Sequence, residues 1–385
     1  MIDRRSFLAT SATALALGLA PRIAFARAAT GKRFVFIIQR GAADGLGTVA
    51  PIGDPAFAPA RGVLAEDFAG LAPVDGMFAL HPNLKTVAGL FAQKQALIAH
   101  AVASPYRDRS HFDGQNVLET GGAGAYQIKD GWLNRLLGLL PQDQARAIAV
   151  AVTVPMALRG AREVSSYAPS NLPQANEDLL QRVAMLYQGD AQLHALWNDA
   201  MKTRALTTDM AATGGQGQGP AAAMATGALA AKLLAPEDGA RIAMIETGGW
   251  DTHAGQRGRL GNQLGALDAM IGALKDGLGP LWGETMVLVA TEFGRTVALN
   301  GTGGTDHGTA SAAMLMGGAV KGGRVLADWP GLGAAALYEG RDLKPTLRLD
   351  AFIGGAVSGH FGVDPARLMP ALFPGTSAKA VAGLV

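Results

Sequence analysis

Acidic and imidazole side chains follow several apolar runs of this sequence, in places where they could together hold a cation. The run Arg33–Gln39 precedes Asp44, and the run Arg241–Glu246 precedes Asp251 and His253. Because ligands of open α/β sheets collect at the carboxyl ends of the strands, these residues are candidates for one shared site. Each has a simpler alternative, since Asp44 also suits a turn and an isolated Asp-x-His pair is a weak signal.

A serine in a further loop could act as a nucleophile. Ser110 and Asp113 follow the run Ala96–Val102 and resemble a capping box, with Asp in place of the usual Glu or Gln, so a helix is expected to start there. Ser110 is either a helix cap or a nucleophile. The position suits a nucleophile because a helix N-terminus stabilises an anion. His111, beside it, is a candidate metal ligand.

The last group lies in two pieces between the apolar runs Thr285–Thr291 and Ala312–Met316. Glu292 closes the first run, and a glycine-flanked pair, Asp306 and His307, comes before the second. Glycines beside an acid and an imidazole suggest close approach by backbone or ligand, and a solvated turn is the alternative.

Pooled, these residues suit a divalent cation. With no cysteine in the chain, acids and histidines fit a hard or borderline ion such as Zn²⁺, Mn²⁺, Ca²⁺ or Mg²⁺. The candidate ligands are Asp44, His111, Asp251, His253, Glu292, Asp306 and His307. The guanidinium groups of Arg107, Arg109 and Arg295 are candidates to hold the oxygens of a phosphate or sulfate. His100, within an apolar strand, is expected to be a core residue.

Composition excludes several classes of protein. The chain of 385 residues is 49% hydrophobic, too much for a disordered protein, and without cysteine it has no disulfide or thiolate chemistry. Beyond residue 26 the basic and acidic residues are equal in number, so there is no electrostatic case for nucleic acid or an anionic membrane. The sequence has no G-x-S-x-G elbow of a serine hydrolase and no Walker loop, and no G-x-G-x-x-G follows the first strand. These absences argue against a bound nucleotide or dinucleotide.

Residues 1–26 have the pattern of an export signal. A charged start is followed by an apolar run, Ala9 to Ala20, and by Ala24-Phe25-Ala26 as a cleavage signal. Arg4-Arg5-Ser6-Phe7-Leu8 resembles the twin-arginine signal, and an ordinary secretory leader is the alternative. The apolar run is short for a membrane span. We therefore expect a mature chain, 27–385, in the periplasm or outside the cell, with the twin-arginine export machinery as a partner and no stable membrane span.

The order of elements predicts an α/β protein with a mostly parallel sheet. The runs at 33–39, 96–102, 147–154, 241–246, 285–291 and 312–316 are expected strands. Leucines and isoleucine from Leu260 to Leu278 alternate at spacings of four and three, which predicts a crossover helix. Residues 172–206 suggest further helix, and about 157–235 is expected to be a mainly helical insertion.

The motifs together resemble one family. They are RGAADGL, RSHFDGQ, GWLNR, GGWDTH, TEFGRT and NGTGGTDHGTAS, with ADWP and the late FPG. They are similar, from about Lys32 to Gly375, to an exported bacterial family of unknown function, the domain-of-unknown-function family fifteen-oh-one. That family is in turn distantly similar to the alkaline phosphatase and sulfatase superfamily.

The distant resemblance implies a three-layer α/β/α sandwich with one or two metals. It matches Asp44 to a metal-binding acid after the first strand and Ser110 to the nucleophile at a helix start. Asp251 and His253 match an Asp–His pair, with a shorter spacing than usual. A second Asp–His pair corresponds by order to Glu292-Phe293 or by identity to Asp306-His307; in the first case His307 matches the last metal histidine.

Two functions remain open from the sequence. The first is an exported, metal-dependent hydrolase of phosphate or sulfate esters, on a small or polymeric substrate, with Ser110 attacking the ester centre. The second is a non-catalytic exported binding or assembly protein on the same fold. Phe293 in place of an imidazole and the short Asp-x-His spacing favour the second.

Overall fold

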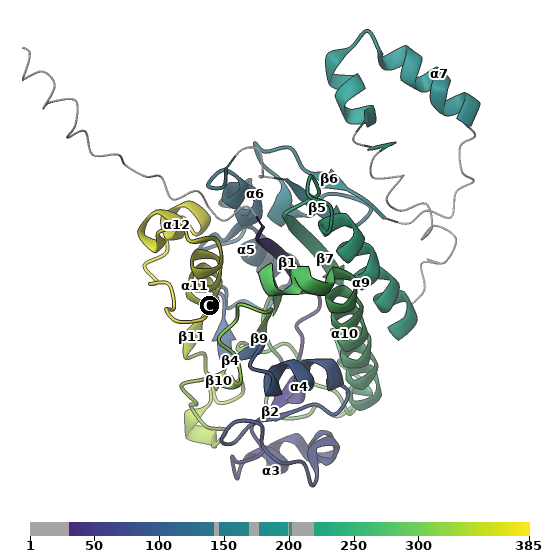
Figure 1. Ribbon diagram of the computed structural model, residues 1–385. Coiled ribbons are helices and arrows are strands. Elements are labelled where there is room, and N and C mark those ends of the chain that lie inside the picture. The colour runs from purple at the N-terminus through teal and green to yellow at the C-terminus, as the bar shows by residue number, and fades with distance from the viewer. Residues whose placement is uncertain (1–30, 142–145, 169–176, 199, 202–218) are drawn as a thin grey trace, which may run out of the picture.

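A computed structural model describes residues 31–141, 146–168, 177–198, 200–201 and 219–385, and its core is a large mixed sheet (Figure 1). The strands of this sheet are β1 (Arg33–Gln39), β4 (Ala96–Ala103), β5 (Ala147–Val150), β6 (Ser165–Ser166), β7 (Ile242–Thr247), β8 (Thr285–Thr291), β9 (Ser311–Met316), β10 (Arg324–Leu326) and β11 (Leu347–Arg348). Their order is β10-β4-β9-β8-β1-β7-β5-β6, and β11 pairs with β4. A separate antiparallel pair joins β2 (Val49–Ala50) and β3 (Ala79–Leu80).

The strands predicted from apolar runs are confirmed. β1 and β8 have the predicted bounds, and the others differ at one or both ends. The largest difference is at β5, which ends at Val150 rather than Val154. Residues 151–154 form bends and irregular chain outside the sheet, ahead of Pro155.

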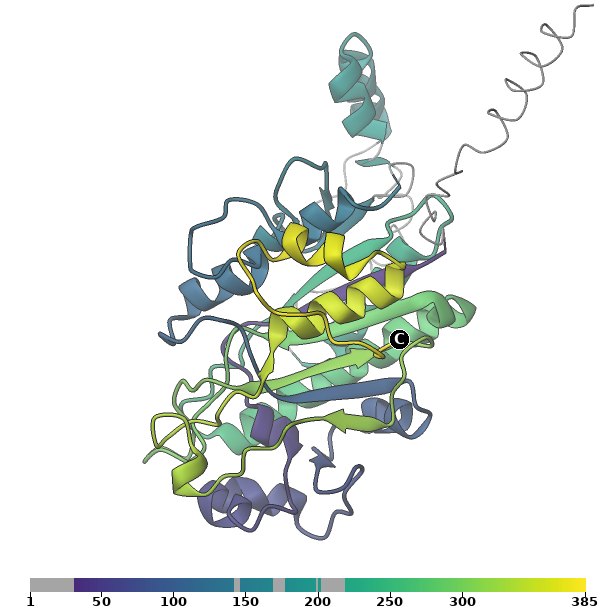
Figure 2. The ribbon, with the colours of Figure 1, turned by 90° about the vertical axis from the view of Figure 1, so that its left-hand side faces the viewer.

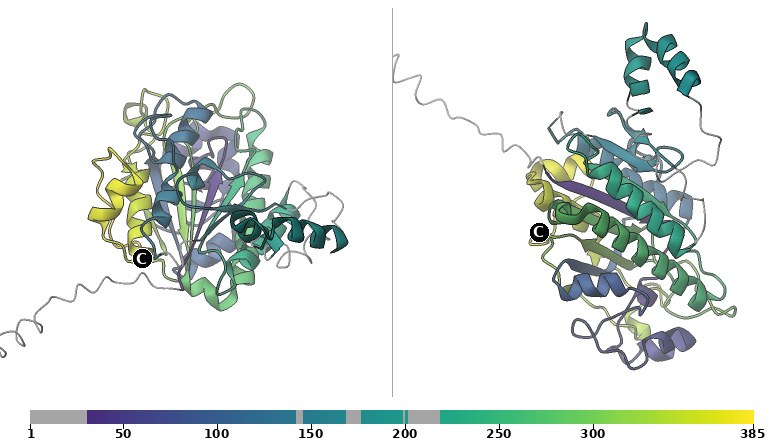
Figure 3. Two further views of the ribbon diagram at one scale, coloured as in Figure 1. Left: turned by 90° about the horizontal axis from the view of Figure 1, so that it is seen from above. Right: turned by 45° about the vertical axis from the view of Figure 1, so that its right-hand side comes forward.

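Helices cover both faces of the sheet and make the predicted three-layer sandwich (Figures 2 and 3). One layer holds α4 (Lys85–Ala92), α9 (Pro220–Leu234) and α10 (Gln256–Leu278), and the other holds α5 (His111–Thr120), α6 (Trp132–Leu137), α11 (Leu349–Phe361) and α12 (Pro365–Leu372). The remaining helices are α2 (Gly45–Thr48), α3 (Phe57–Arg61), α7 (Glu177–Tyr187) and the 3-10 helices η1 (Gly62–Phe68), η2 (Met156–Leu158), η3 (Gly279–Glu284) and η4 (Ala334–Ala336).

Alternation along β1 explains the two cores. Phe34, Phe36 and Ile38 point into the core beneath α6 and α11, while Val35 and Ile37 point into the core beneath α9 and α10. A strand buried on both faces needs apolar residues at every position, which is why the run RFVFIIQ does not alternate with polar residues.

The predicted crossover helix is confirmed as α10, and α9 packs along it. The helical insertion expected at about 157–235 lies partly outside the described residues. Within the described residues, no helix is long and apolar enough to cross a membrane.

β9 is the exception to the parallel order. It pairs antiparallel with both β8 and β4, whereas the other pairings in the main sheet are parallel. The segment 292–310 therefore leaves the sheet after β8 and re-enters it at the same edge. Residues at both ends of this segment can thus reach the carboxyl ends of β1 and β7.

Two histidines belong to the core. His100 is fully buried, and its Nε2 lies 2.8 Å from the carbonyl oxygen of Val49, which confirms the expectation. His360, in α11, is also fully buried, with Nε2 donating to the carbonyl of Arg33 at 2.8 Å. Burial lowers the pKa of His360 to about 4, and the hydrogen bond to Arg33 opposes that shift only in part.

The buried His360 makes the fold sensitive to acid. Because the pKa of His360 is lower in the folded chain than in the unfolded chain, stability is lost as the pH falls from about 6.5 towards 4. Replacing it in His360→Gln should reduce the loss of unfolding free energy between pH 7 and 4.5 by about 2–3 kcal/mol. Urea unfolding at the two pH values measures this. The exposed His194→Gln is the control, and equal pH dependence in both variants would contradict the prediction.

Candidate metal centre

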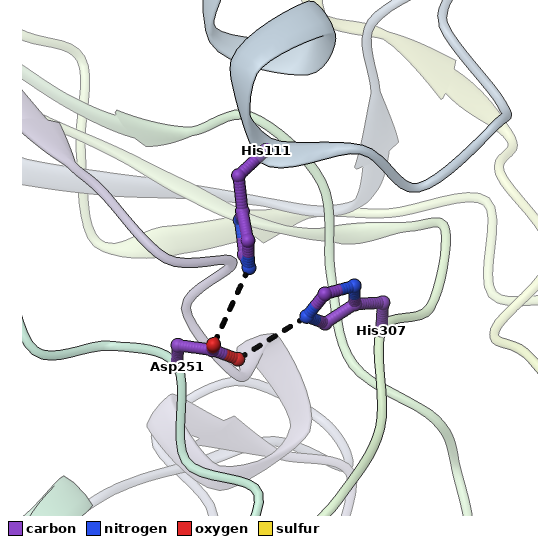
Figure 4. Close-up of side chains that lie close together, drawn as sticks. All are labelled: His111, Asp251 and His307. Atoms are coloured by element: carbon purple, nitrogen blue, oxygen red, sulfur yellow. Dashed lines mark hydrogen bonds and ion pairs between the residues drawn. The ribbon is translucent and has the colours of Figure 1, made fainter.

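Segments that follow different strands meet at the carboxyl edge of the sheet. His111 begins α5, which follows β4; Asp251 and His253 follow β7; and His307 lies in the segment between β8 and β9. Figure 4 shows His111, Asp251 and His307 pointing toward one another from these separate segments. One ligand atom from each of the three lies within 4.8 Å of the others.

The Nε2 atoms of three histidines surround the carboxylate of Asp251. His253 Nε2 lies 2.9 Å from Asp251 Oδ1, and His307 Nε2 lies 3.2 Å from the same oxygen. His111 Nε2 lies 3.5 Å from Asp251 Oδ2. The Nε2 atoms of His253 and His307 are 3.0 Å apart. His111 Nε2 is buried and makes no hydrogen bond.

The Nδ1 atom of each of these rings faces an oxygen that can only accept a hydrogen bond. Each Nδ1 must therefore carry the proton, which leaves a lone pair on Nε2 of each neutral ring. The Nδ1 partners are Glu292 Oε1 for His111 (2.9 Å), Asp306 Oδ1 for His253 (2.9 Å) and the Arg109 carbonyl for His307 (3.0 Å).

In their neutral forms the three rings direct Nε2 lone pairs toward the Asp251 carboxylate. The hydrogen bond with Glu292 raises the pKa of His111, which favours the charged form of that ring when no other cation is present. Acceptors at this spacing repel one another unless a cation lies between them. Ligand atoms on a tetrahedral ion with bonds of about 2.0 Å are about 3.3 Å apart, close to the spacings here. Outward Nδ1–H groups bonded to carboxylates or carbonyls are the usual support of metal-bound histidines. His111, Asp251 and His307 are thus the residues that fit a metal ion, and His253 lies beside them, against Asp251 and His307.

The charges of the site are held in place by their neighbours. Burial works against the charged form of Asp251, but the hydrogen bond and charge of Arg295 outweigh it and keep the pKa of Asp251 low. Burial likewise opposes ionised Glu292, yet hydrogen bonds from His111 and Gln115 hold its pKa below the ordinary range. Burial lowers the pKa of His307 and so favours its neutral, ligating form.

Two predicted ligands, Glu292 and Asp306, lie behind the histidines rather than among the converging atoms. Glu292 is fully buried and accepts from the Gly41 amide at 2.8 Å as well as from His111. Asp306 accepts from His253 and from Asn300 at 3.1 Å, and the Asn300 hydrogen bond lowers its pKa. Both carboxylates orient a histidine.

Asp44 lies apart from the converging atoms. It caps α2 by accepting from the Leu46 amide at 3.1 Å, and it is wholly buried against the guanidinium of Arg61 and the amide of Gln256. The hydrogen bonds continue from Gln256 to Thr305, and from Thr305 to Arg295. Asp44 therefore supports the site at a distance, through this chain of bonds.

The three candidate arginines have separate partners. Arg295, fully buried, donates to Asp251 Oδ1 at 2.6 Å and to the backbone carbonyl of Thr305. Arg107 donates to the carbonyls of Ser104 and Tyr106. Arg109 pairs with the carboxylates of Glu339 and Asp342.

Ser110 precedes His111 directly, at the start of α5, so the predicted helix start is confirmed. The predicted capping box is wrong, because the Ser110 side chain makes no capping bond. Asp113 instead lies 3.4 Å from the Tyr106 hydroxyl, which accepts the Ser110 amide hydrogen at 3.1 Å. The Ser110 hydroxyl is thus not committed to the helix.

Several residues of the site escaped sequence reasoning. Phe293 was interpreted as a lost imidazole, but its ring stacks on His111 with centroids 5.1 Å apart and contacts His307 at 5.4 Å. Gln256 donates to Asp44, and Asp342 pairs with Arg109, each a partner far away in sequence. No sequence motif indicates either residue. For Phe293 the signal was present, since it directly follows Glu292, just past the end of β8.

The geometry predicts that His111 and His307 bind a divalent ion, for which Zn²⁺ is a suitable probe. His111→Ala and His307→Ala should each weaken Zn²⁺ binding at least about 10-fold, because each removes one of few ligands and leaves an acceptor without its donor. Isothermal calorimetry on the metal-free chain measures the change. His194→Ala, at an exposed position, should bind as the wild type does, and equal affinity in all four proteins would refute the site.

Comparisons with known proteins agree with the predicted family. No curated protein sequence matches the chain significantly. Among solved structures, Ps i-CgsB in complex with k-i-k-neocarrahexaose matches with a TM-score of 0.35 and 10% identity, over 86% of this chain and 72% of that one. A mutant of TAB5 alkaline phosphatase with magnesium bound matches with a TM-score of 0.28 and 12% identity, over 74% of this chain and 92% of that one.

Both structural likenesses are weak. The family match is much more extensive, covering residues 31–367. The chain belongs to the family described as protein of unknown function (DUF1501).

Proposed function

We propose that this chain is a metal-dependent hydrolase of phosphate or sulfate esters. The single observation behind the proposal is the convergence of three Nε2 atoms and the Asp251 carboxylate, each imidazole backed by an acceptor at Nδ1. Three imidazole nitrogens with one carboxylate suit Zn²⁺ better than Mg²⁺ or Ca²⁺, which prefer oxygen ligands. We take Zn²⁺ as the first ion to test.

The metal would be held by His111, Asp251, His253 and His307. When bound, it would supply a Lewis acid that stabilises the negative charge developing on the ester oxygens. Arg295 keeps Asp251 ionised and fixed in place, while Glu292 and Asp306 hold two of the imidazoles in the ligating tautomer. The chain thus prepares the site before substrate arrives.

We propose Ser110 as the group that attacks. It stands next to His111 in sequence, at the N-terminus of the ten-residue helix α5, and its hydroxyl is not used as a cap. The positive end of the helix dipole favours the alkoxide form of the serine and an anionic ester beside it. The Ser110 oxygen would form a bond to phosphorus or sulfur as the ester alcohol leaves, and water would then release the acid and restore the serine.

Exposure of the site fits a substrate that arrives from solvent. The side chains of Asp251 and His253 are 43% and 44% exposed, whereas Glu292 and Arg295 behind them are fully buried. An open rim over a rigid base admits a small ester or one on a polymer.

Ser110→Ala tests the nucleophile. The zinc-loaded variant should lose turnover of an aryl phosphate or aryl sulfate by at least about 100-fold and should bind Zn²⁺ as before, because Ser110 is not a ligand. Release of the coloured phenol measures turnover. Ser165→Ala, in the exposed strand β6, is the control.

The alternative of a binding or assembly protein has its own outcome. Zinc binding without turnover of either ester, in the wild type, would reject the hydrolase and leave a metal-dependent binding protein. Phe293, which packs against His111 and His307 in place of a further ligand, is the observation that favours this alternative.

We also propose export by the twin-arginine route. The motif Arg4-Arg5 followed by Phe7 and Leu8 supports it, and residues 1–30 lie outside the described residues. Replacing both arginines, in the double variant Arg4→Lys with Arg5→Lys, should keep the chain in the cytoplasm of a host with that machinery. Cell fractionation measures the change, and unaltered export would favour an ordinary secretory leader.

A further inference from the structure

Asp342 gathers two arginines beside the metal centre without reaching the converging atoms itself. Its side chain is fully buried. Oδ2 lies 2.8 Å from Arg109 Nη2 and 2.9 Å from Arg109 Nε, and it accepts from the Thr309 hydroxyl at 2.7 Å. Oδ1 accepts from Arg341 Nε at 2.9 Å. One carboxylate thus ties together three segments distant in sequence.

Arg109 carries the first link to His307. Its φ of +60° is rare for a residue with a side chain and is strained, so contacts must hold it there. In this conformation its carbonyl oxygen lies 3.0 Å from His307 Nδ1, while its guanidinium reaches Asp342. The ion pair with Asp342 is therefore suited to keep the carbonyl in position.

Arg341 carries the second link. Its Nη2 donates to the backbone carbonyl of His307 at 2.7 Å, and its Nε donates to Asp342. His307 is consequently held at its ring through Arg109 and at its backbone through Arg341. Both Arg109 and Arg341 form ion pairs with the same buried carboxylate, Asp342.

We infer that Asp342 is a positioning residue that fixes His307 in the tautomer able to ligate the metal, an inference that rests on the metal centre proposed above. Without the charge of Asp342, Arg109 loses its main tether and its backbone can leave the left-handed region. The acceptor for Nδ1–H then moves, and the ring can carry its proton on Nε2, where it blocks ligation.

Asp342→Asn is the test, because it keeps the shape of the side chain and removes its charge. Asp350→Asn is the matched control: Asp350 is also buried and accepts from Arg348 and Thr376, but it lies at the start of α11. Arg109→Met is a second variant that removes the tether while Asp342 keeps Arg341 and Thr309. It guards against a folding defect in Asp342→Asn.

The first readout needs no metal. Nitrogen-15 NMR of the histidine-labelled, metal-free full chain reports which ring nitrogen carries the proton, and His307→Ala assigns the signal. The wild type and Asp350→Asn should show His307 protonated at Nδ1. Asp342→Asn and Arg109→Met should show loss of that form in favour of Nε2–H or of exchange between the two.

The second readout is zinc affinity by calorimetry. Asp342→Asn should weaken Zn²⁺ binding by about 10–100-fold, and Asp350→Asn should not. An unchanged tautomer with unchanged affinity in Asp342→Asn would overturn the inference, and so would an equal loss in Asp350→Asn. If the wild type binds no zinc but the tautomer still shifts, the positioning role stands and the proposed metal-dependent function falls.

Discussion

The site depends on compensating charge where three imidazoles face one carboxylate. The Nε2 atoms of the three rings lie within 3.5 Å of the Asp251 carboxylate, while their Nδ1–H groups point outward to other acceptors. Polar atoms brought together in this way cost free energy unless a cation compensates them. The surrounding fold must therefore be stiff enough to hold the arrangement in place.

Stiffness comes from charged groups placed behind the ligands. Glu292 and Asp306 hold histidines, and Arg295 holds Asp251. Three carboxylates against one guanidinium leave two negative charges, which is the charge that a divalent ion cancels. The buried Arg295 behind the site offsets one of these charges and keeps Asp251 ionised.

The sequence predicted correctly which residues lie at the carboxyl edge of the sheet. It predicted the role of each of these residues less accurately. The apolar runs marked β1 and β8 because strands buried on both faces must be apolar throughout. Residues near the strand ends, such as Asp251 after β7 and His307 ahead of β9, were predicted to converge, and they do. The direction in which a side chain points depends on partners far away in sequence. Asp44 was thus expected to bind metal, but a buried arginine from α3 holds it.

The reversal of β9 has a consequence for how the family could vary. Both ends of the segment 292–310 are anchored at one edge of the sheet, by β8 and β9, and its site residues lie close to those two anchors. Residues Thr296 to Gly304 form a hairpin-like detour. The distance between the two ends of this detour is fixed by the sheet and not by the number of residues in it. Asn300 in that detour donates to Asp306 and to the carbonyl of His253, so insertions or deletions that spare Asn300 would reshape the mouth of the site and leave the inner residues in place.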